Sequence, residues 1–255
     1  YPFRPQDRGF DEVLVHGGGV VGHTPDHWMN NYFDDTYVHN GVKEKFAGYC
    51  TDIWFDNAIQ YIRQNADTPF FVYLSLNAPH SPFIAPEEDV AVYRNNPDVP
   101  DPNFYGMISR IDKNLPRLTD ELESLGLTKN TILIFMTDNG TSQGYRNGVG
   151  YNAGMRGIKG SLYDGGHRVP CWFHWPAGNL TGGRDVTRIT DHVDILPTLI
   201  DLCDLRLPRD VRFDGTSLSP LLKGEDHAWP DRVMVAENQV SLQPVKWRNC
   251  AVMTD

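Results

Sequence analysis

The pattern of hydrophobic positions along the chain predicts both strands and helices. Continuous apolar runs at 69–76 (PFFVYLSL) and 131–137 (TILIFMT) are typical of strands that are buried on both faces, as in parallel sheets. Further strand candidates lie at 12–16 (EVLVH) and 169–175 (VPCWFHW). Residues 17–48 are rich in Gly, Asn, Asp and aromatic side chains without periodicity, so we predict an irregular segment there.

Apolar residues recur at helical spacing in three other segments. A helix is expected at 51–62, with its first two residues, Thr-Asp, as the cap. The clearest helical pattern covers 104–125 and stops at Gly126, and Pro116 within it predicts a kink. A short helix is expected at 194–203. Because strands and helices alternate at these spacings, the predicted fold class is α/β, with a largely parallel central sheet flanked by helices.

Polar residues follow two of the predicted strands. Asn77 and His80 come after the first long run, and Asp138 and Asn139 come directly after the second. A turn would explain Asp-Asn-Gly, because Asx-Gly pairs supply the positive φ of tight turns. A turn does not explain polar groups at two strand ends that would share one edge of a parallel sheet, where α/β proteins place their active sites. We therefore predict a functional site at this edge.

A stretch dense in glycine and charge at 154–170 adds a cation to this prediction. Lys159 lies between Ile158 and Gly160, and small residues let a lysine ammonium and the backbone approach a ligand closely. Taken alone, Lys159 could be a solvated side chain in a flexible loop. Together with the strand ends, it indicates an oxyanion site with a hard cation, Ca²⁺ or Mg²⁺, on the Asp138 and Asn139 oxygens.

Six segments in order resemble one known family. They are NAPHSPFIAPE (77–87), YGMISRIDKNLPRLTDELESLGL (105–127), TILIFMTDNG (131–140), GIKGSLYDGGHRVP (157–170), HVDILPTLIDL (192–202) and FDGTSLSPLLKG (213–224). Together they look like the type I sulfatases, the formylglycine-dependent arylsulfatase family of the alkaline phosphatase superfamily. The resemblance covers most of residues 10–255, and its strength lies in the order and spacing of the six segments.

The resemblance implies a calcium-dependent hydrolase of sulfate esters and assigns roles to four residues. Asp138 and Asn139 match two calcium ligands of the family that also approach the sulfate. Lys159 matches the lysine that binds sulfate oxygens, and His80, in its A-P-H-x-P segment, matches the histidine near the leaving-group oxygen. These roles agree with the chemistry, since a cation neutralises charge on the transferring group and a histidine can protonate an alkoxide. His80 could otherwise be a loop or core histidine.

The family's nucleophile is missing from the sequence. It is a formylglycine made from the Cys or Ser of a C/S-x-P/A-x-R motif, and none of Cys50, Cys171, Cys203 and Cys250 has that context. The family's remaining calcium ligands also belong to an upstream segment. Since Ca²⁺ takes six to eight ligands, we expect weak or no metal binding by these 255 residues alone.

The chain is therefore expected to be an inactive fragment of a longer sulfatase. We predict that residues 1–225 are the C-terminal part of the catalytic core and that 226–255 begin a small, truncated C-terminal subdomain. The run CAVMTD (250–255) looks like a strand that is just starting, and no downstream residues remain to pair with it. The resemblance to this family implies that the protein is exported to the periplasm, a lysosome or the cell exterior.

Composition narrows the range of partners. A net charge of −10 argues against nucleic acid as the main partner, and no apolar run approaches the ~20 residues of a membrane span. The expected substrate is a saccharide or small-molecule sulfate ester. Aromatic residues in the irregular segments 17–48 and 81–102 would suit a sugar or aryl ring, or could equally be local packing: Trp28, Tyr32, Phe33, Tyr37 and Tyr93.

Two alternatives remain at this stage. One is a phosphodiesterase, phosphonate hydrolase or phosphatase of the same superfamily, although dimetal phosphatases need His and Asp ligands that have no counterpart in this sequence. The other is a catalytically silent homologue that serves as a binding module. The histidines at 16, 23, 27 and 39 match no catalytic motif, and surface or structural roles are expected for them.

Overall fold

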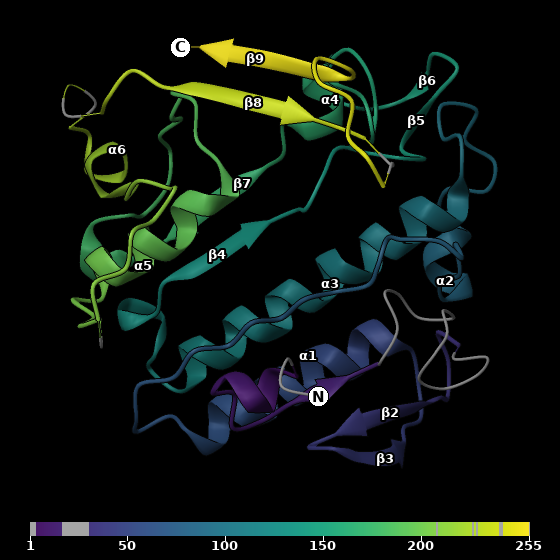
Figure 1. The fold of residues 1–255 in the computed structure, drawn as a ribbon. Helices are drawn as coiled ribbons and strands as arrows, with labels where there is room; N and C mark the ends of the chain where they lie inside the picture. Colours follow the sequence, from purple (N-terminus) through teal and green to yellow (C-terminus); the bar gives the residue numbers. More distant parts are fainter. Residues whose placement is uncertain are drawn as a thin grey trace. The chain divides into compact units, whose positions relative to one another are not determined.

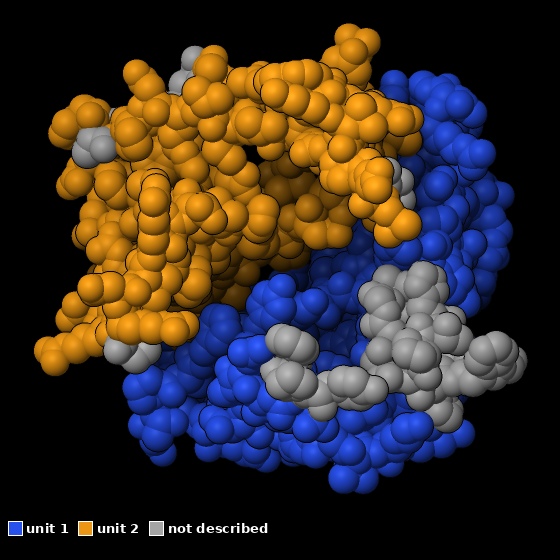
Figure 2. Space-filling model, viewed as in Figure 1, with its two compact units in different colours: residues 1–128, 142–152 blue, residues 129–141, 153–255 orange. Residues whose placement is uncertain are grey.

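The structure is a computed structural model that describes residues 4–16, 31–207, 209–225, 227, 229–239 and 242–254. Its helices and strands are drawn in Figure 1. The chain divides into two compact units, coloured separately in Figure 2. Unit 1 comprises residues 1–128 and 142–152, and unit 2 comprises residues 129–141 and 153–255.

Unit 1 begins with a small antiparallel sheet. After η1 (Pro5–Arg8), β1 (Leu14–Val15), β2 (Thr36–His39) and β3 (Val42–Lys45) pair in the order β1-β2-β3. Asn40 and Gly41 join β2 to β3 with φ of 49° and 86°, the positive values that a two-residue type I′ turn requires. The prediction of an irregular segment at 17–48 is thus wrong for residues 36–45, which form the β2–β3 hairpin. Residues 17–30 lie outside the described part of the chain.

Three helices follow in unit 1: α1 (Cys50–Gln64), α2 (Glu87–Val90) and α3 (Pro102–Ser124). The predicted apolar face of α1 is buried, but its N-cap is Tyr49, so the expected Thr-Asp cap lies inside the first turn. The Asp101 side chain caps α3 by accepting from two backbone N–H groups. α3 continues through Pro116, and Gly126 follows its end with φ of 69°, as predicted.

α1 and α3 are joined by polar contacts beside a hydrophobic core. Asp52 on α1 accepts from Arg110 Nη2 at 2.6 Å and from Asn114 Nδ2 at 2.7 Å, both on α3.

Within the described parts of the chain, no helix is both long and apolar enough to cross a membrane.

Most of the aromatic residues considered for a sugar or aryl ring serve local packing instead. Tyr32 and Tyr37 are completely buried in the core of unit 1, and the Phe33 ring packs 4.9 Å from that of Tyr49. The Tyr93 hydroxyl pairs with Ser109 Oγ at 2.7 Å. Trp28 lies outside the described residues.

Residues 69–76 are extended but do not form the predicted strand. Exposure alternates along the segment, with Phe71 59% and Tyr73 72% exposed, which is the period of a strand. No described residue pairs with this segment in a ladder. The sequence pattern therefore identified an extended segment. The prediction of a buried strand is wrong, since a strand is defined by its hydrogen bonds to a neighbouring strand.

Unit 2 is built on β4 (Leu133–Met136), which pairs with β7 (Cys171–His174). The pairing is antiparallel, with Leu133 opposite His174 and Met136 opposite Cys171. The pairs of the described strands are all antiparallel, including the short pair β5 (Tyr145–Arg146) and β6 (Val149–Gly150) of unit 1. The strand positions at 131–137 and 169–175 are confirmed, whereas the parallel pairing expected for them is wrong. Helices and sheets occur together, as the α/β class requires.

The C-terminal half of unit 2 surrounds one buried carboxylate. η4 (His192–Asp194), α5 (Ile195–Leu202) and α6 (Ser219–Lys223) follow β7, and the short helix predicted at 194–203 is confirmed. Asp194 is fully buried and accepts from Arg232 Nη1 at 2.6 Å and from the Thr216 N–H at 2.8 Å. It also forms a capping box with Asp191, so one side chain joins three segments of the unit.

The described chain ends in the hairpin of β8 (Val233–Glu237) and β9 (Cys250–Thr254). The strand predicted at 250–255 is confirmed, but its partner is upstream: Glu237 lies opposite Cys250 and Val233 opposite Thr254. The expectation that this strand needs a downstream neighbour is therefore wrong. The hairpin belongs to the same compact unit as β4, and the predicted domain boundary at 225 stays a prediction. The shorter elements of unit 2 and its border are η2 (Thr128–Asn130), α4 (Asp164–His167) and η3 (Pro176–Gly178).

Candidate functional site

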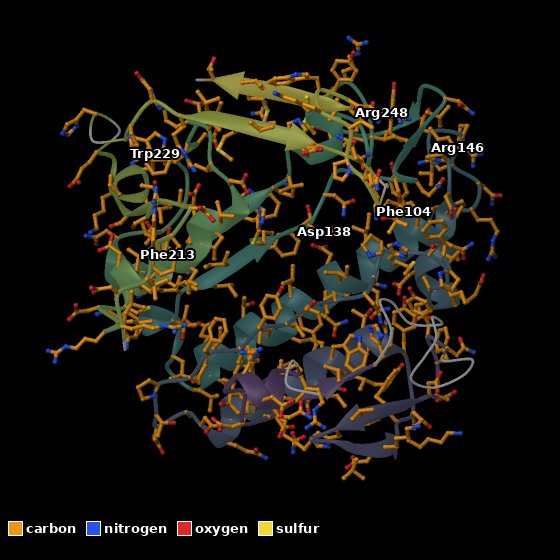
Figure 3. The ribbon with its side chains drawn as sticks, viewed as in Figure 1. Phe104, Asp138, Arg146, Phe213, Trp229 and Arg248 are labelled. Carbon is orange, nitrogen blue, oxygen red and sulfur yellow. The ribbon has the colours of Figure 1, made fainter. Side chains whose placement is uncertain are left out.

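Asp138 and Asn139 follow β4 after one intervening residue, Thr137, and Figure 3 labels Asp138 in the chain beyond this strand. The Asp138 side chain is exposed, and the described residues provide it with no hydrogen bond or ion pair. Asn139 is half-buried, and its carbonyl accepts from Thr137 Oγ1 at 3.5 Å. Two oxygen-bearing side chains are therefore displayed in sequence at the end of a strand, with the carboxylate available to a ligand.

The loop after β4 is bonded to the glycine-rich segment that carries Lys159. The Gly140 N–H donates to Gly166 O at 3.0 Å, and the Lys159 N–H donates to Thr141 O at 2.8 Å. These two bonds place Lys159 beside the loop of Asp138 and Asn139, although 21 positions separate Lys159 from Asp138. The structure thus brings together three of the four predicted site residues within one unit.

Glycines make this close approach possible. A Cβ on Gly140 would lie 1.9 Å from Gly165 O, and a Cβ on Gly165 would lie 2.1 Å from Gly157 O. Gly166 is equally confined, because its Cβ would lie 2.1 Å from Ser161 O. Backbone atoms cannot move aside as a flexible side chain can, so only glycine fits at these positions. The glycine density seen in the sequence therefore reflects backbone packing around Lys159.

The Lys159 ammonium has no acidic partner among the described residues, and the side chain is exposed. Other cations, such as Arg110, Arg117 and Arg232, pair with carboxylates. The nearby Arg156 instead lies over the Tyr163 ring, 3.6 Å from its centroid. An unpaired ammonium on a fixed backbone can bind an anionic group.

His80 belongs to unit 1, where buried side chains hold its turn. The His80 N–H donates to Asn77 O at 2.9 Å, and the buried Tyr32 hydroxyl donates to His80 O at 2.7 Å. Asn77 is buried, and its side-chain oxygen accepts from Trp54 Nε1 on α1 at 2.8 Å. Tyr32 and Trp54 were not predicted to support His80, and nothing in the local sequence around His80 could have identified them.

The His80 ring is oriented through its Nδ1 atom. Nδ1 lies 3.0 Å from Ser81 O and 3.3 Å from Ser81 Oγ. Because a carbonyl can only accept, the closer contact favours a proton on Nδ1. The neutral ring then carries the lone pair on Nε2, and Nε2 becomes a donor only when the ring is cationic. His80 can thus exchange a proton at Nε2 while Nδ1 stays anchored.

The donor atoms fit a hard divalent cation, but only in part. Carboxylate and amide oxygens, as on Asp138 and Asn139, are the ligands that Ca²⁺ and Mg²⁺ prefer. Among the described residues, no group of three or more His, Cys, Asp or Glu side chains is arranged to hold a metal. Two protein ligands are fewer than the six to eight oxygens that Ca²⁺ takes.

The other candidate groups have different roles. Burial raises the pKa of the Cys50 thiol to about 12, so Cys50 stays protonated and is a poor nucleophile. His39 contacts the carboxylates of Glu12 and Glu44 beside the β1-β2-β3 sheet, which fits the expected structural role. His23 and His27 lie outside the described residues.

Comparison with known proteins places these features in context. The model of the family described as Sulfatase matches residues 2–205. The chain is 28% identical over 235 residues to the uncharacterized sulfatase YdeN of Escherichia coli, covering 90% of this chain and 40% of that protein. It is 31% identical over 209 residues to the steryl-sulfatase of Mus musculus, covering 76% of this chain and 31% of that protein.

A solved structure is similar over nearly the whole chain. The crystal structure of Ps i-CgsB in complex with k-i-k-neocarrahexaose has a TM-score of 0.80 and 28% identity, covering 93% of this chain and 55% of that one. The predicted sulfatase-like α/β fold is confirmed by this match. The chain spans well under half the length of the two curated relatives.

Proposed function

The chain belongs to the sulfatase family, and on this basis we propose that the full-length protein hydrolyses sulfate esters. The observation that carries the proposal is the backbone bond between Lys159 and Thr141, which holds the Lys159 backbone beside the loop of Asp138 and Asn139. A lysine and the oxygen ligands of a metal ion, carried by two loops that are bonded to each other, suit an anionic tetrahedral group. They supply the electrostatic stabilisation that is usually the largest catalytic contribution.

In this proposal each residue has a separate task. Asp138 and Asn139 would hold a Ca²⁺ ion, and Lys159 would bind sulfate oxygens. His80 protonates the departing oxygen through Nε2, while Ser81 holds Nδ1. The bound Ca²⁺ would neutralise charge that develops on the sulfuryl group, with Mg²⁺ as the alternative ion.

The remaining parts of the site are assigned to residues outside this sequence. A formylglycine from an upstream segment would supply the nucleophile, and the same segment would complete the calcium site. Neither group is required for the positions of Asp138, Asn139 and Lys159, which the bonds within unit 2 maintain.

The proposed substrate is a sulfated saccharide. Ps i-CgsB, at 28% identity, was solved with an oligosaccharide, k-i-k-neocarrahexaose. An aryl sulfate is the alternative substrate, because the name of the mouse relative, steryl-sulfatase, refers to a sulfate ester that is not a saccharide. We also propose that the protein is exported.

The test is hydrolysis by the full-length protein of sulfated oligosaccharides, an aryl sulfate, and the matching aryl phosphate and phosphonate monoester. Release of inorganic sulfate is followed by ion chromatography. The proposal predicts that sulfate esters are hydrolysed faster than their phosphorus analogues and that calcium chelation stops the reaction.

The two alternatives give different results in the same assay. Hydrolysis of the phosphonate or phosphate without sulfate release would identify a phosphorus-ester hydrolase. Saturable binding of a sulfated oligosaccharide without any hydrolysis would identify a silent binding protein. Activity on simple aryl sulfates alone would contradict the saccharide assignment but not the reaction.

A further inference from the structure

Asn238 lies at the end of β8 and contacts the Lys159 loop across a long sequence separation. Its backbone N–H donates to Asn249 O at 3.0 Å and closes the end of the β8–β9 hairpin. Its side-chain amide, Nδ2, donates to the carbonyl of Gly160, 78 positions away in the sequence. The same residue therefore belongs to the hairpin through its backbone and to the Lys159 loop through its side chain.

The Lys159 loop needs such a restraint. Gly157 and Gly160 flank Ile158 and Lys159 with φ of 84° and 86°, and glycine has more conformational freedom than any other residue. The Lys159 N–H is fixed by Thr141, as described above. The bond from Asn238 fixes the carbonyl of Gly160, the residue after Lys159. The backbone is therefore held both before and after the Lys159 Cα.

The contact also explains why position 160 is a glycine. A Cβ on Gly160 would lie 3.2 Å from Asn238 Nδ2, which is closer than an ordinary contact. The positive φ of Gly160 adds a second reason. The loop and the Asn238 amide thus fit each other.

We propose that Asn238 is a positioning residue for Lys159, through which the β8–β9 hairpin sets the position of the sulfate-binding ammonium. The inference rests on the proposed function for its catalytic consequence. Asn238 does not touch the substrate, and its effect passes through the Gly160 carbonyl alone. The hairpin is therefore part of the apparatus that orients the anion, although none of its residues has been assigned to the site.

Gln239 provides a matched control. It is the next residue, it is half-buried, and its side-chain amide donates to the carbonyls of Val245 and Arg248 within the hairpin. Its Oε1 accepts from the Val245 N–H at 2.7 Å. Gln239→Ala therefore disturbs the hairpin end without removing the bond to the Lys159 loop.

The experiment compares Asn238→Ala, Asn238→Asp and Gln239→Ala in the full-length protein. The aspartate keeps the shape of the side chain but cannot donate to Gly160 O when ionised. We expect both Asn238 variants to lose about tenfold or more in kcat/KM for a sulfate ester, a size typical of misplaced catalytic groups. We expect Gln239→Ala to stay close to the wild type.

Two further measurements separate positioning from general destabilisation. In a Lys159→Ala background, Asn238→Ala should cause no additional loss of kcat/KM, because there is no ammonium left to position. Amide hydrogen exchange at Lys159 should become faster in Asn238→Ala and unchanged in Gln239→Ala.

The outcomes are distinguishable. An undiminished loss in the Lys159→Ala background, or a fully active Asn238→Asp variant, would overturn the inference. A wild-type protein without sulfate ester hydrolysis would contradict the proposed function instead. In that case hydrogen exchange at Lys159 still decides whether Asn238 restrains the loop.

Discussion

At the residue scale, the site consists of exposed polar groups on backbone that has little freedom. Lys159 and Asp138 have exposed side chains, while peptide groups near them are hydrogen-bonded. The Lys159 N–H donates to Thr141 O, the Gly140 N–H donates to Gly166 O, and Gly160 O accepts from Asn238 Nδ2. A fixed backbone keeps polar groups oriented before the substrate arrives, and this preorganisation is what electrostatic catalysis requires.

Lys159→Ala should lower kcat/KM for sulfate esters by about 10²–10³-fold, the usual loss when one donor to a developing anion is removed. The exposed Lys223 at the end of α6 provides the control, since it has no acidic partner among the described residues either. Lys223→Ala should retain wild-type kcat/KM. Equal losses in the two variants would indicate an effect of net charge rather than of position.

His80→Ala should reduce kcat/KM by about 10²–10⁴-fold for esters with poor leaving groups, where protonation of the departing oxygen matters most. The loss should be much smaller for an activated aryl sulfate. His192→Ala removes an exposed ring and should leave both rates unchanged. The measurement is a series of aryl sulfates of graded leaving-group pKa, and equal losses along the series would contradict the role of His80.

At the element scale, the sequence predicted the three longest helices and some of the strand positions, but not the strand pairing. Helical periodicity located α1, α3 and α5, because apolar residues recur at helical spacing in each of them, and apolar residues of α1 and α3 are buried. Pairing depends on neighbours distant in the sequence, so the antiparallel β4–β7 pair could not be derived from two apolar runs. The β2–β3 hairpin was predictable from its Asn-Gly turn and was missed.

The same contrast holds within the site. Asp138, Asn139, Lys159 and His80 were proposed from residue type and motif order, and their roles stay predictions. The residues that support them act through single hydrogen bonds from remote elements, as Tyr32 does for His80 and Asn238 for the Lys159 loop. Such contacts leave no periodic or local signal, and only the fold reveals them.

Asp194→Ala should destabilise the protein by about 3–5 kcal/mol, because it leaves the Arg232 guanidinium buried without its charge partner. The control is Asp231→Ala, which breaks an exposed Asp–Arg pair of 3.4 Å with Arg188. That change should cost at most about 1 kcal/mol, as is usual for surface pairs. Urea denaturation of the full-length variants checks this, and similar midpoints for both would contradict the central packing role of Asp194.

At the scale of the whole molecule, the proposed activity needs more chain than these 255 residues contribute. His80 belongs to unit 1, whereas Asp138, Asn139 and Lys159 belong to unit 2. The described residues offer two oxygen ligands where Ca²⁺ takes six to eight. Segment 69–76 likewise has strand-like alternation without a described partner strand. The proposed function therefore assigns the nucleophile and the remaining metal ligands to residues outside these 255.

The most direct test of this account is calorimetric titration of the full-length protein with Ca²⁺, for the wild type, Asp138→Ala and Asp164→Ala. Asp164 is the control, because it is an exposed carboxylate on the same glycine-rich segment as Lys159. The account predicts saturable binding to one site in the wild type and in Asp164→Ala, and at least about tenfold weaker binding in Asp138→Ala, as expected when a ligand carboxylate is lost. Equal Ca²⁺ affinity in all three proteins, or no binding by the wild type, would contradict the assignment of Asp138 to the metal and with it the proposed site.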